Sequence, residues 1–293
     1  MALSEQQIKN WARALSETEN SKCVNTVSAI RKVLEDHFGS KIKVFLQGSY
    51  ANSTNVRQDS DVDIVACYQD AYFPNYSFLD QVERVVYESN ATAHDYKFSE
   101  FKNDVMILLR SNFGTSVERK EKCIHIKGNI YRVNVDVVPC FLHSRFMPSG
   151  VTIEGIELRT DTAKIPVKNF PDQHKANGQE KNQLTDQKYK AVVRILKNCR
   201  NFLIDNNHID EKFMPSFFLE CIVWNVPNSC FMNDSYKEMT NNVISKIYDD
   251  MSVQETANNY AEISDLIWLF KGQTKRTPAI ANQFLKQVYG VIN

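Results

Sequence analysis

The stretch GSYANSTNVRQDSDVDIVACY, Gly48–Tyr68, decides the fold. It opens with a Gly-Ser turn and runs into β-branched residues that carry Asp61 and Asp63. Residues i and i+2 of a strand point to the same face, so both carboxylates are predicted to project side by side. The opposite face is predicted to pack the core through Val62, Ile64 and Ala66. Paired carboxylates repel each other unless a cation lies between them, and the turn before them suits a phosphate, so this stretch predicts a divalent metal beside a phosphate.

A third carboxylate comes from the alternating segment IYRVNVDVVPCF. One face is predicted to carry Val133, Val135 and Val137, and the other Arg132, Asn134 and Asp136. The Gly128-Asn129 pair before this segment predicts a tight hairpin, which would place the strand in the same sheet. Three aspartates at the edge of a sheet suit two Mg²⁺ ions, with Mn²⁺ as a substitute, that clamp the attacking and leaving oxygens of a phosphoryl displacement.

This ordered set resembles a known superfamily. A Gly-Ser turn, an Asp-x-Asp pair and a later Asp in an apolar strand resemble the nucleotidyltransferase fold of DNA polymerase β. The version here resembles the bacterial relatives of cGAS and oligoadenylate synthase, the CD-NTases, which include DncV and make cyclic dinucleotide signals in antiphage defence. The segments LKNCRN around Lys197 and MPSFFLECIVWNVP around Ser216 match as well, so the resemblance runs from Gln47 to Pro227.

The resemblance implies an α+β fold with a mixed sheet and helices, followed by a C-terminal α-helical lobe, with the active site in the cleft between them. We expect a catalytic core with an N-terminal spine helix over residues 1–165 and the helical lobe over residues 166–293. Apolar spacing predicts one long or broken helix over 4–38, and further helices from about 78 and about 100. The polar stretch that begins at Asn169 is predicted to be a long irregular connection, and the chain from about 186 onward is predicted to be helical, with runs near 213–226, 236–251, 255–271 and 278–292.

The same resemblance implies roles for the residues of the core. Ser49 and the backbone N–H groups around Gly48 would hold the terminal phosphates of the donor nucleotide. Gln47 either orients this turn or simply ends a strand. The carboxylate pair that follows would hold the metals. Asp136 would bind the catalytic metal and help to deprotonate the attacking ribose hydroxyl.

In the helical lobe, Lys197 and Ser216 would reach the triphosphate. A lysine on a helix is usually solvated, so its role rests on the resemblance. Pro215 marks a helix start, and a helix N-terminus favours an anion, which supports Ser216. Phe217 would stack on the donor base, although it is also typical of a core aromatic residue.

Base choice is predicted from Asn169 in the segment VKNFPDQH, at a position where purine-using members of the family tend to carry Ser. An Asn offers a donor and an acceptor, which match the O4 and N3–H edge of uracil. The resemblance to the CdnE clade therefore favours UTP as one substrate, with ATP or GTP beside it. An Asn that caps the turn before Phe170, and a purine-only product, are the alternatives.

Bulk composition limits the partners. The 35 basic and 35 acidic residues cancel, which argues against a surface that wraps long nucleic acid, and no DNA template is expected. The amphipathic N-terminus lacks the apolar core of a signal peptide, and no apolar run approaches a membrane span, so we expect a cytoplasmic protein without a membrane partner.

The expected reaction joins two NTPs through a linear intermediate into a cyclic dinucleotide, with release of two pyrophosphates. As the resemblance implies, the product would activate a separate effector protein in a CBASS-type defence system, which also leaves room for CBASS accessory proteins as partners. Two other classes share parts of this pattern. A nucleotidyltransferase that acts on RNA, protein or a small molecule would have the same triad, whereas a non-catalytic nucleotide-binding module would have no need for all three aspartates.

Overall fold

The structure is a computed structural model that describes residues 2–56, 61–148, 150–272 and 276–293. Residues 57–60, within the stretch that decides the fold, lie outside the described residues. The chain forms two compact units. The sheet unit comprises Glu17–Tyr50 and Asp61–Pro171, and the helical unit comprises Met1–Ser16, Ala51–Ser60 and Asp172–Asn293.

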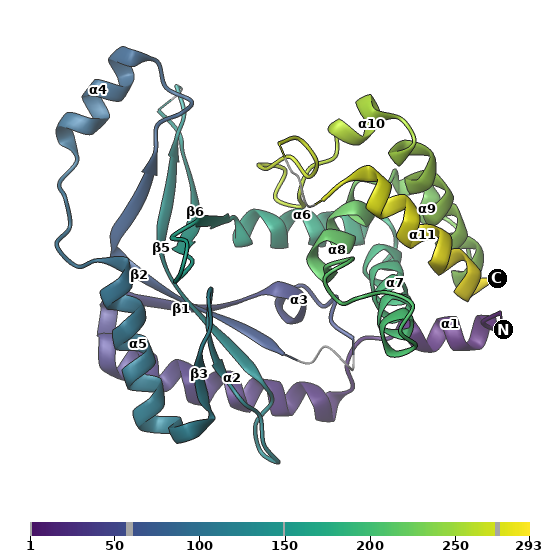
Figure 1. Cartoon of the computed structure of the whole chain (residues 1–293), viewed down its shortest axis with the longest axis horizontal. Coiled ribbons are helices and arrows are strands. Elements are labelled where there is room, and N and C mark those ends of the chain that lie inside the picture. The colour runs from purple at the N-terminus through teal and green to yellow at the C-terminus, as the bar shows by residue number, and fades with distance from the viewer. Residues whose placement is uncertain (1, 57–60, 149, 273–275) are drawn as a thin grey trace. The chain divides into compact units, whose positions relative to one another are not determined.

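The sheet unit is built on a mixed sheet, which has seven strands within the described residues (Figure 1). The central order is β1-β2-β5-β4-β3, with β6 paired to β5 and β7 paired to β6. β2 and β5 run parallel, whereas the other strand pairs in the described residues are antiparallel. The strands are β1 (Ile42–Gln47), β2 (Val62–Asn75), β3 (Val117–Arg119), β4 (Ile124–Ile126), β5 (Val135–Phe146), β6 (Thr152–Arg159) and β7 (Pro166–Asn169).

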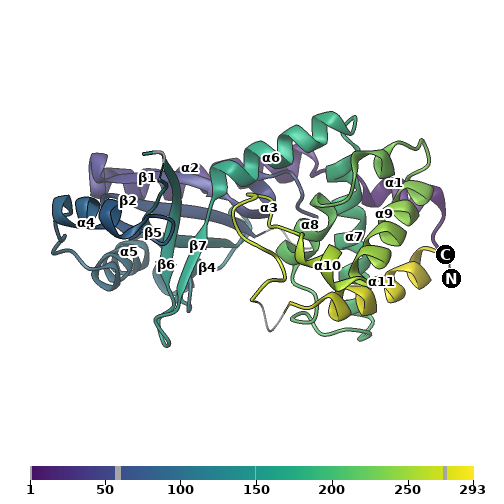
Figure 2. The same cartoon turned by 90° about the horizontal axis from the view of Figure 1, so that it is seen from above.

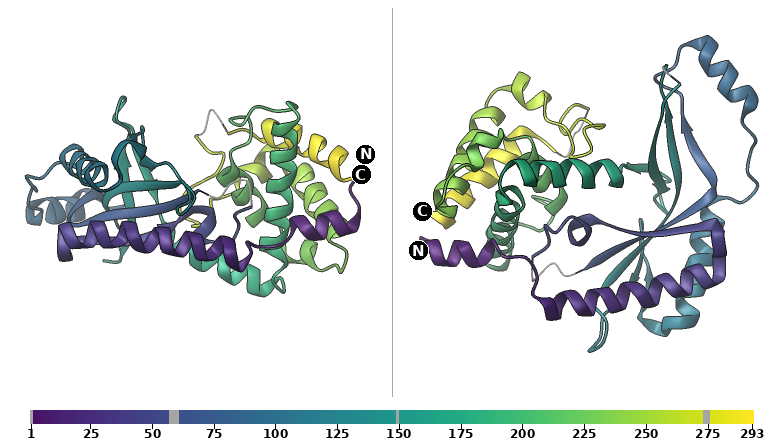
Figure 3. Two further views of the ribbon diagram at one scale, coloured as in Figure 1. Left: turned by 90° about the horizontal axis from the view of Figure 1, so that it is seen from below. Right: turned by 180° about the vertical axis from the view of Figure 1, so that it is seen from behind.

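Three longer helices accompany this sheet: α2 (Glu17–Phe38), α4 (Gln81–Asn90) and α5 (Phe98–Phe113). A short helix, α3 (Gly48–Ala51), directly follows β1, and single 3-10 turns occur at Gly39–Lys41 and Gly114–Ser116. α2 runs alongside β1 and also contacts α5 (Figure 3). The predicted helices near 78 and 100 are therefore present, and they begin at Gln81 and Phe98, two or three residues from the predicted starts. Each begins directly after a residue whose backbone N–H is capped by a glutamate side chain in the first turn of the helix.

The apolar face predicted for β2 is confirmed. Val62, Ile64 and Ala66 are all fully buried. Val65 and Cys67, which alternate with them and share the face of Asp63, are buried as well. The polar character of that face is therefore confined to the first residues of β2, where the chain enters the sheet.

The hairpin that carries Asp136 is present but has a longer connection than predicted. β4 and β5 pair antiparallel, and the last pair is Ile126 with Val135, so residues 127–134 are not strand. The Asn129 side chain accepts hydrogen bonds from the backbone N–H groups of Tyr131 and Arg132, at 2.8 Å each. These local bonds compete with strand pairing, which explains why the predicted strand begins only at Val135.

The helical unit gathers α1 with the C-terminal helices (Figure 2). Its helices are α1 (Glu5–Trp11), α6 (Pro171–Leu184), α7 (Lys188–Asp205), α8 (Ser216–Trp224), α9 (Tyr236–Met251), α10 (Gln254–Asn258) and α11 (Pro278–Ile292), with a 3-10 turn at Asn228–Phe231. One continuous core joins them, and it takes Ile8 and Ala12 from the N-terminal segment. The predicted helix over 4–38 is thus broken, and its first part packs with the helical unit, so the units are not the contiguous halves 1–165 and 166–293.

Two expectations about the C-terminal part were wrong. The stretch expected to be an irregular connection forms α6, because Pro171 occupies its first position, where a missing N–H costs no hydrogen bond. Its buried residues, Gly178 and Asn182, give no apolar period that the sequence could reveal. Conversely, the predicted helix over 255–271 ends at Asn258. The chain beyond it turns, and an isolated bridge joins Ala261 to Trp268.

None of the helices in the described ranges is both long enough and apolar enough to cross a bilayer.

Candidate active site

Five polar residues lie in one row across the sheet, one from each of β1, β2, β5, β4 and β3. Asp63 of β2 pairs with Gln47 of β1 on one side and with Asp136 of β5 on the other. Asp136 in turn pairs with His125 of β4. Directly paired residues on neighbouring strands project to the same face, and the strands lie about 4.8 Å apart. The structure therefore brings Asp63 and Asp136 side by side, as the alternating patterns predicted. Gln47 and His125 lie next to this pair, and Glu118 of β3 continues the row beyond His125.

The turn after β1 touches this row. Gly48 has a backbone φ of +71°, and a Cβ atom added there would lie 2.0 Å from Asp63 Oδ2. Only glycine combines this left-handed conformation with the space that the carboxylate occupies. Ser49 follows within α3 and is half-buried. The Gly-Ser turn thus approaches the Asp63 carboxylate itself, which places its backbone beside the predicted metal ligands.

Asp61 is placed differently from the other two aspartates. β2 begins at Val62, so Asp61 stands just before the strand rather than on it, and its side chain is exposed. No group of three or more His, Cys, Asp or Glu side chains in the described ranges is arranged to hold a metal ion. The donor set nevertheless fits a hard cation, because Asp63 and Asp136 present carboxylate oxygens on adjacent strands. A three-aspartate metal site requires the Asp61 side chain to turn toward that pair.

His125 holds Asp136 from the neighbouring strand. His125 Nδ1 lies 2.8 Å from Asp136 Oδ1, and the carboxylate can only accept, so the ring nitrogen is the donor. The side chains are 15% and 28% exposed, respectively, so water competes little for this bond. The contact holds Oδ1 of Asp136 in place.

Cys123 lies next to the same carboxylate. Burial, together with the negative charge of Asp136, raises the pKa of the Cys123 thiol to about 12. The thiol is therefore protonated at neutral pH and is neither a thiolate nucleophile nor an anionic metal ligand there.

In the helical unit, Lys197 is buried rather than solvated. Its Nζ donates to Glu220 Oε2 at 2.9 Å and to Thr54 Oγ1 at 3.3 Å, and Thr54 Oγ1 donates to Glu220 at 2.8 Å. His174 Nε2 lies 3.4 Å from the other Glu220 oxygen. Burial alone would raise the pKa of Glu220, but Lys197 and His174 lower it to about 2. The ammonium group of Lys197 is thus committed to a buried pair, and its predicted contact with a triphosphate remains a prediction.

Ser216 and Phe217 open α8. Pro215 precedes the helix, as the sequence predicted, and Ser216 is its first residue and half-buried. Phe217 is 36% exposed, with its ring 5.7 Å from the ring of His174 and 5.9 Å from the Arg276 guanidinium. Phe217 is therefore not a core residue, whereas its neighbour Phe218 is fully buried. An aromatic face at the surface, next to a cation, suits the stacking role that remains predicted for Phe217.

Asn169 ends β7 and is half-buried. It pairs with Ile156 of β6, and the missing side chain of Gly155 leaves room for the Asn169 carbonyl, which a Cβ at Gly155 would approach to 2.6 Å. Its backbone position is thus fixed by the sheet. The role of its side chain in base choice remains a prediction.

Two residues of the candidate site, His125 and Glu220, were not predicted from the sequence. His125 stands between Ile124 and Ile126, which are both buried, so the alternation did carry a signal that it shares the wet face. The pairing of Glu220 with Lys197 could not be predicted in this way. A single acid in an apolar helix does not show which residue it will meet, and this pair forms only when α7 and α8 pack together.

Comparison with known proteins shows the family of the chain. Residues 27–159 match the nucleotidyltransferase domain, and residues 176–293 match the C-terminal helical domain of cGAS/DncV-like nucleotidyltransferases. A cyclic dipurine nucleotide synthase from Elizabethkingia meningoseptica is 43% identical over 293 residues, which is 100% of this chain and 99% of the relative. The chain belongs to the cyclic dinucleotide synthases of the cGAS/DncV-like nucleotidyltransferase family.

Solved structures of such synthases have the same fold. The E. meningoseptica CdnE synthase, solved with GTP and Apcpp, has a TM-score of 0.84 at 42% identity and covers 98% of each chain. The Rhodothermus marinus c-UMP-AMP synthase, solved with Apcpp and Upnpp, has a TM-score of 0.83 at 29% identity, covering 98% of this chain and 95% of that one. The present synthase is therefore a nucleotidyltransferase with the predicted α+β core and C-terminal helical domain.

Proposed function

We propose that this synthase makes a cyclic dinucleotide that contains at least one uridine, and that the row across β1, β2, β5 and β4 is its catalytic centre. The observation that carries the catalytic centre is the direct pairing of Asp63 with Asp136, beside a turn at Gly48 whose close approach to Asp63 only glycine allows. Two carboxylates held in register on adjacent strands suit a nucleotidyl transfer at divalent cations.

Asp61, Asp63 and Asp136 would hold two Mg²⁺ ions, or Mn²⁺ in their place. When bound, these ions would stabilise the charge that develops on the attacking and leaving oxygens. The chain's own groups would do the rest. Ser49 and the backbone N–H of Gly48 would hold the terminal phosphates of the donor nucleotide, while Gln47 orients the turn.

The proton of the acceptor's ribose hydroxyl would pass to Asp136, whose other oxygen His125 holds in place. The hydroxyl oxygen then forms a bond to the α-phosphorus of the donor, the bond from that phosphorus to the β-phosphate bridge oxygen breaks, and pyrophosphate leaves. The linear product would turn round in the site, and a second displacement of the same kind closes the ring and releases the second pyrophosphate.

Base choice is proposed to depend on Asn169. Its amide matches the O4 and N3–H edge of uracil, and the sheet fixes its backbone. The c-UMP-AMP synthase among the similar structures supports a uridine product. The similarity to a cyclic dipurine synthase favours a second candidate, a purine-only product from ATP and GTP.

In the cell, we propose that the product is a messenger that activates a separate effector protein in CBASS-type antiphage signalling, with CBASS accessory proteins as further partners. This step rests on the family and not on any residue of the site.

One experiment tests the reaction and the bases together. The protein is incubated with Mg²⁺ or Mn²⁺ and all four NTPs, and phosphatase-resistant products are identified by mass spectrometry. We expect a product with the mass of a cyclic dinucleotide that contains uridine, and its loss in Asp61→Asn/Asp63→Asn. Asn169→Ser should shift the product toward purines. A purine-only product from the unchanged protein would refute the uridine proposal and leave the second candidate.

A further inference from the structure

The sheet unit has a cavity of about 430 Å³ far from the aspartates. Its walls come from the second half of β2, from β5, from the start of α5 with the segment before it, and from the end of β6 with the turn that follows. Along β2 the path from Asp63 to Phe73 is on the order of 30 Å at about 3.3 Å per residue, so the cavity is separate from the proposed catalytic centre. Its volume lies within the range of about 300–1,000 Å³ that is typical of small-molecule sites.

One wall of the cavity is aromatic and well packed. Phe73 stacks on Phe141 with their centroids 5.5 Å apart, and Phe98 meets Phe141 edge-on at 5.7 Å. Tyr72 also lines the cavity and is 42% exposed, with its ring 6.4 Å from that of Phe146. Such a wall suits a planar aromatic group.

The other wall is cationic. Arg159 lies over the Phe73 ring at 4.7 Å and donates an N–H to Glu157 Oε1 at 3.0 Å in an ion pair, so its guanidinium is held in one orientation. Lys97 and Lys164 also line the cavity, and among the described residues neither has a carboxylate within ion-pair distance. In a protein whose charges cancel overall, these two ammonium groups leave the cavity positive.

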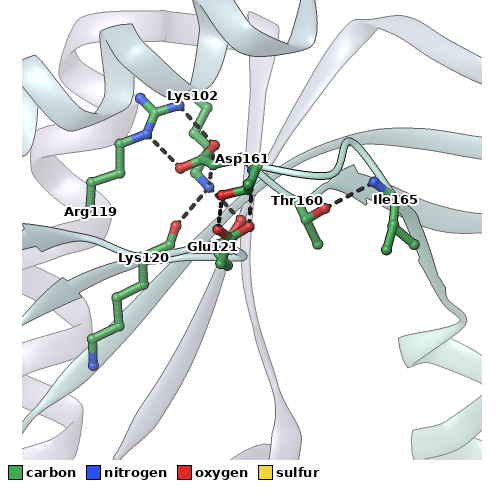
Figure 4. A network of polar contacts seen from close by, with 8 residues as sticks. Lys102, Arg119, Lys120, Glu121, Thr160, Asp161 and Ile165 are labelled. Atoms are coloured by element: carbon green, nitrogen blue, oxygen red, sulfur yellow. Dashed lines mark hydrogen bonds and ion pairs between the residues drawn. The ribbon is translucent and has the colours of Figure 1, made fainter.

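The acid in the cavity lining does not offset this charge. Asp161 accepts from Arg119 at 2.8 and 3.0 Å and pairs with the fully buried Lys102 at 3.0 Å (Figure 4). These partners hold the pKa of Asp161 below its usual value, although burial opposes them. Arg119 and Lys102 thus neutralise the Asp161 carboxylate, which therefore does not offset the positive charge of Lys97 and Lys164.

The turn that carries Lys164 is fixed from several sides. Thr160 N donates to Ile165 O at 3.1 Å. Ile165 N donates back to Thr160 Oγ1 at 2.9 Å, as Figure 4 shows. Lys164 itself adopts φ +53°, a left-handed conformation that non-glycine residues rarely adopt. The backbone thus holds this lysine at a set position on the rim, which lowers the ordering cost of binding an anion.

We propose that this cavity binds a nucleoside phosphate, with the base against the aromatic wall and the phosphates on Lys97, Lys164 and Arg159. An aromatic face joined to a cluster of cations is the complement of a base joined to phosphates. The ligand's source is either a free nucleotide or the dinucleotide that the enzyme makes, and the second source rests on the proposed function.

The test uses the full chain in EDTA, which weakens binding at metal-dependent sites. The protein is photolabelled with 8-azido-ATP, and the labelled peptides are mapped by mass spectrometry. We expect label on peptides that contain residues 94–99 or 159–164. ATP should protect these peptides, whereas adenosine and tripolyphosphate at equal concentration should not, since each supplies only half of the recognition. The purified dinucleotide product is a further competitor, and stronger protection by it than by ATP would identify the product as the ligand.

The matched variants are Lys97→Glu/Lys164→Glu and the control Lys41→Glu/Lys43→Glu, which reverses two exposed lysines of the same unit outside the cavity. The first pair should weaken ATP protection about tenfold or more, and the control should leave it unchanged. Label confined to other peptides, equal protection by tripolyphosphate, or an equal loss in the control would overturn the proposal. Dinucleotide synthesis by the same samples is measured separately, so a failure of the proposed function would be visible without affecting this result.

Discussion

Asp136 and His125 face each other across the β5–β4 pair, with Asp136 Oδ1 2.8 Å from His125 Nδ1. The bond fixes one oxygen of a carboxylate that we propose to serve the reaction. Outer partners of this kind orient metal-binding carboxylates, and their removal typically costs about 10- to 100-fold in metal affinity or activity.

His125→Ala is therefore expected to lower kcat by about 10- to 100-fold and to weaken Mn²⁺ binding, as measured by electron paramagnetic resonance. His125→Asn, whose amide can still donate to Asp136, should recover part of both. Asp136→Ala serves as the reference for loss of the site. If Asp136→Ala abolishes Mn²⁺ binding while His125→Ala leaves it unchanged, the positioning role of His125 is wrong.

Gly48 and Gly39 form a matched pair for testing the turn beside Asp63. Both have positive φ, +71° and +59°, so an alanine at either costs roughly 1–2 kcal/mol of backbone energy. A Cβ at Gly48 would also lie 2.0 Å from Asp63 Oδ2, whereas a Cβ at Gly39 meets nothing within 4 Å. Gly48→Ala should thus abolish dinucleotide synthesis, and Gly39→Ala should lose stability alone. Equal activity of the two folded variants, checked by thermal unfolding and product analysis, would refute the close approach.

The buried Lys197–Glu220 pair predicts how stability depends on pH. The pKa of Glu220 is about 2 in the folded chain, below the roughly 4.3 of an unfolded glutamate. The unfolded state therefore binds more protons between these values. The stabilisation is complete above the unfolded pKa and is lost as the pH falls toward 2.

Its size is on the order of 3 kcal/mol at 1.36 kcal/mol per pKa unit. Urea unfolding at several pH values should show this loss in the unchanged protein and a smaller one in Glu220→Gln. The exposed Glu211 provides the control Glu211→Gln, which should keep the full pH dependence. If the free energy of unfolding depended on pH equally in all three proteins, Glu220 would not be the group responsible for that dependence.

The sequence predicted those parts of the site that depend on local periodicity. Alternation over two residues places Asp63 and Asp136 on a strand face, and the glycine before Ser49 predicts the turn. The row itself depends on register between strands, and the register of His125 with Asp136 follows from the length of the 127–134 connection, which Asn129 sets through its side chain. Helix α6 was not predicted because its buried residues, Gly178 and Asn182, form no apolar period along the sequence.

Phe217 supports a prediction about nucleotide affinity. It stands at the start of α8, exposed beside His174 and Arg276, whereas the next ring, Phe218, is buried in the core. If Phe217 stacks on the donor base, Phe217→Leu should raise KM for the NTPs about five- to tenfold with little change in kcat, since stacking contributes about 0.5–1.5 kcal/mol beyond burial and acts equally before and during the reaction.

The control is Phe202→Leu, which alters another exposed ring of the helical unit, on α7, and should leave KM unchanged. Phe217→Trp should preserve or lower KM, because a larger ring stacks at least as well. A fall in kcat at constant KM would contradict stacking, since that pattern belongs to a residue that acts only in the transition state. Steady-state kinetics with each NTP varied in turn would also show whether the ring serves one nucleotide or both.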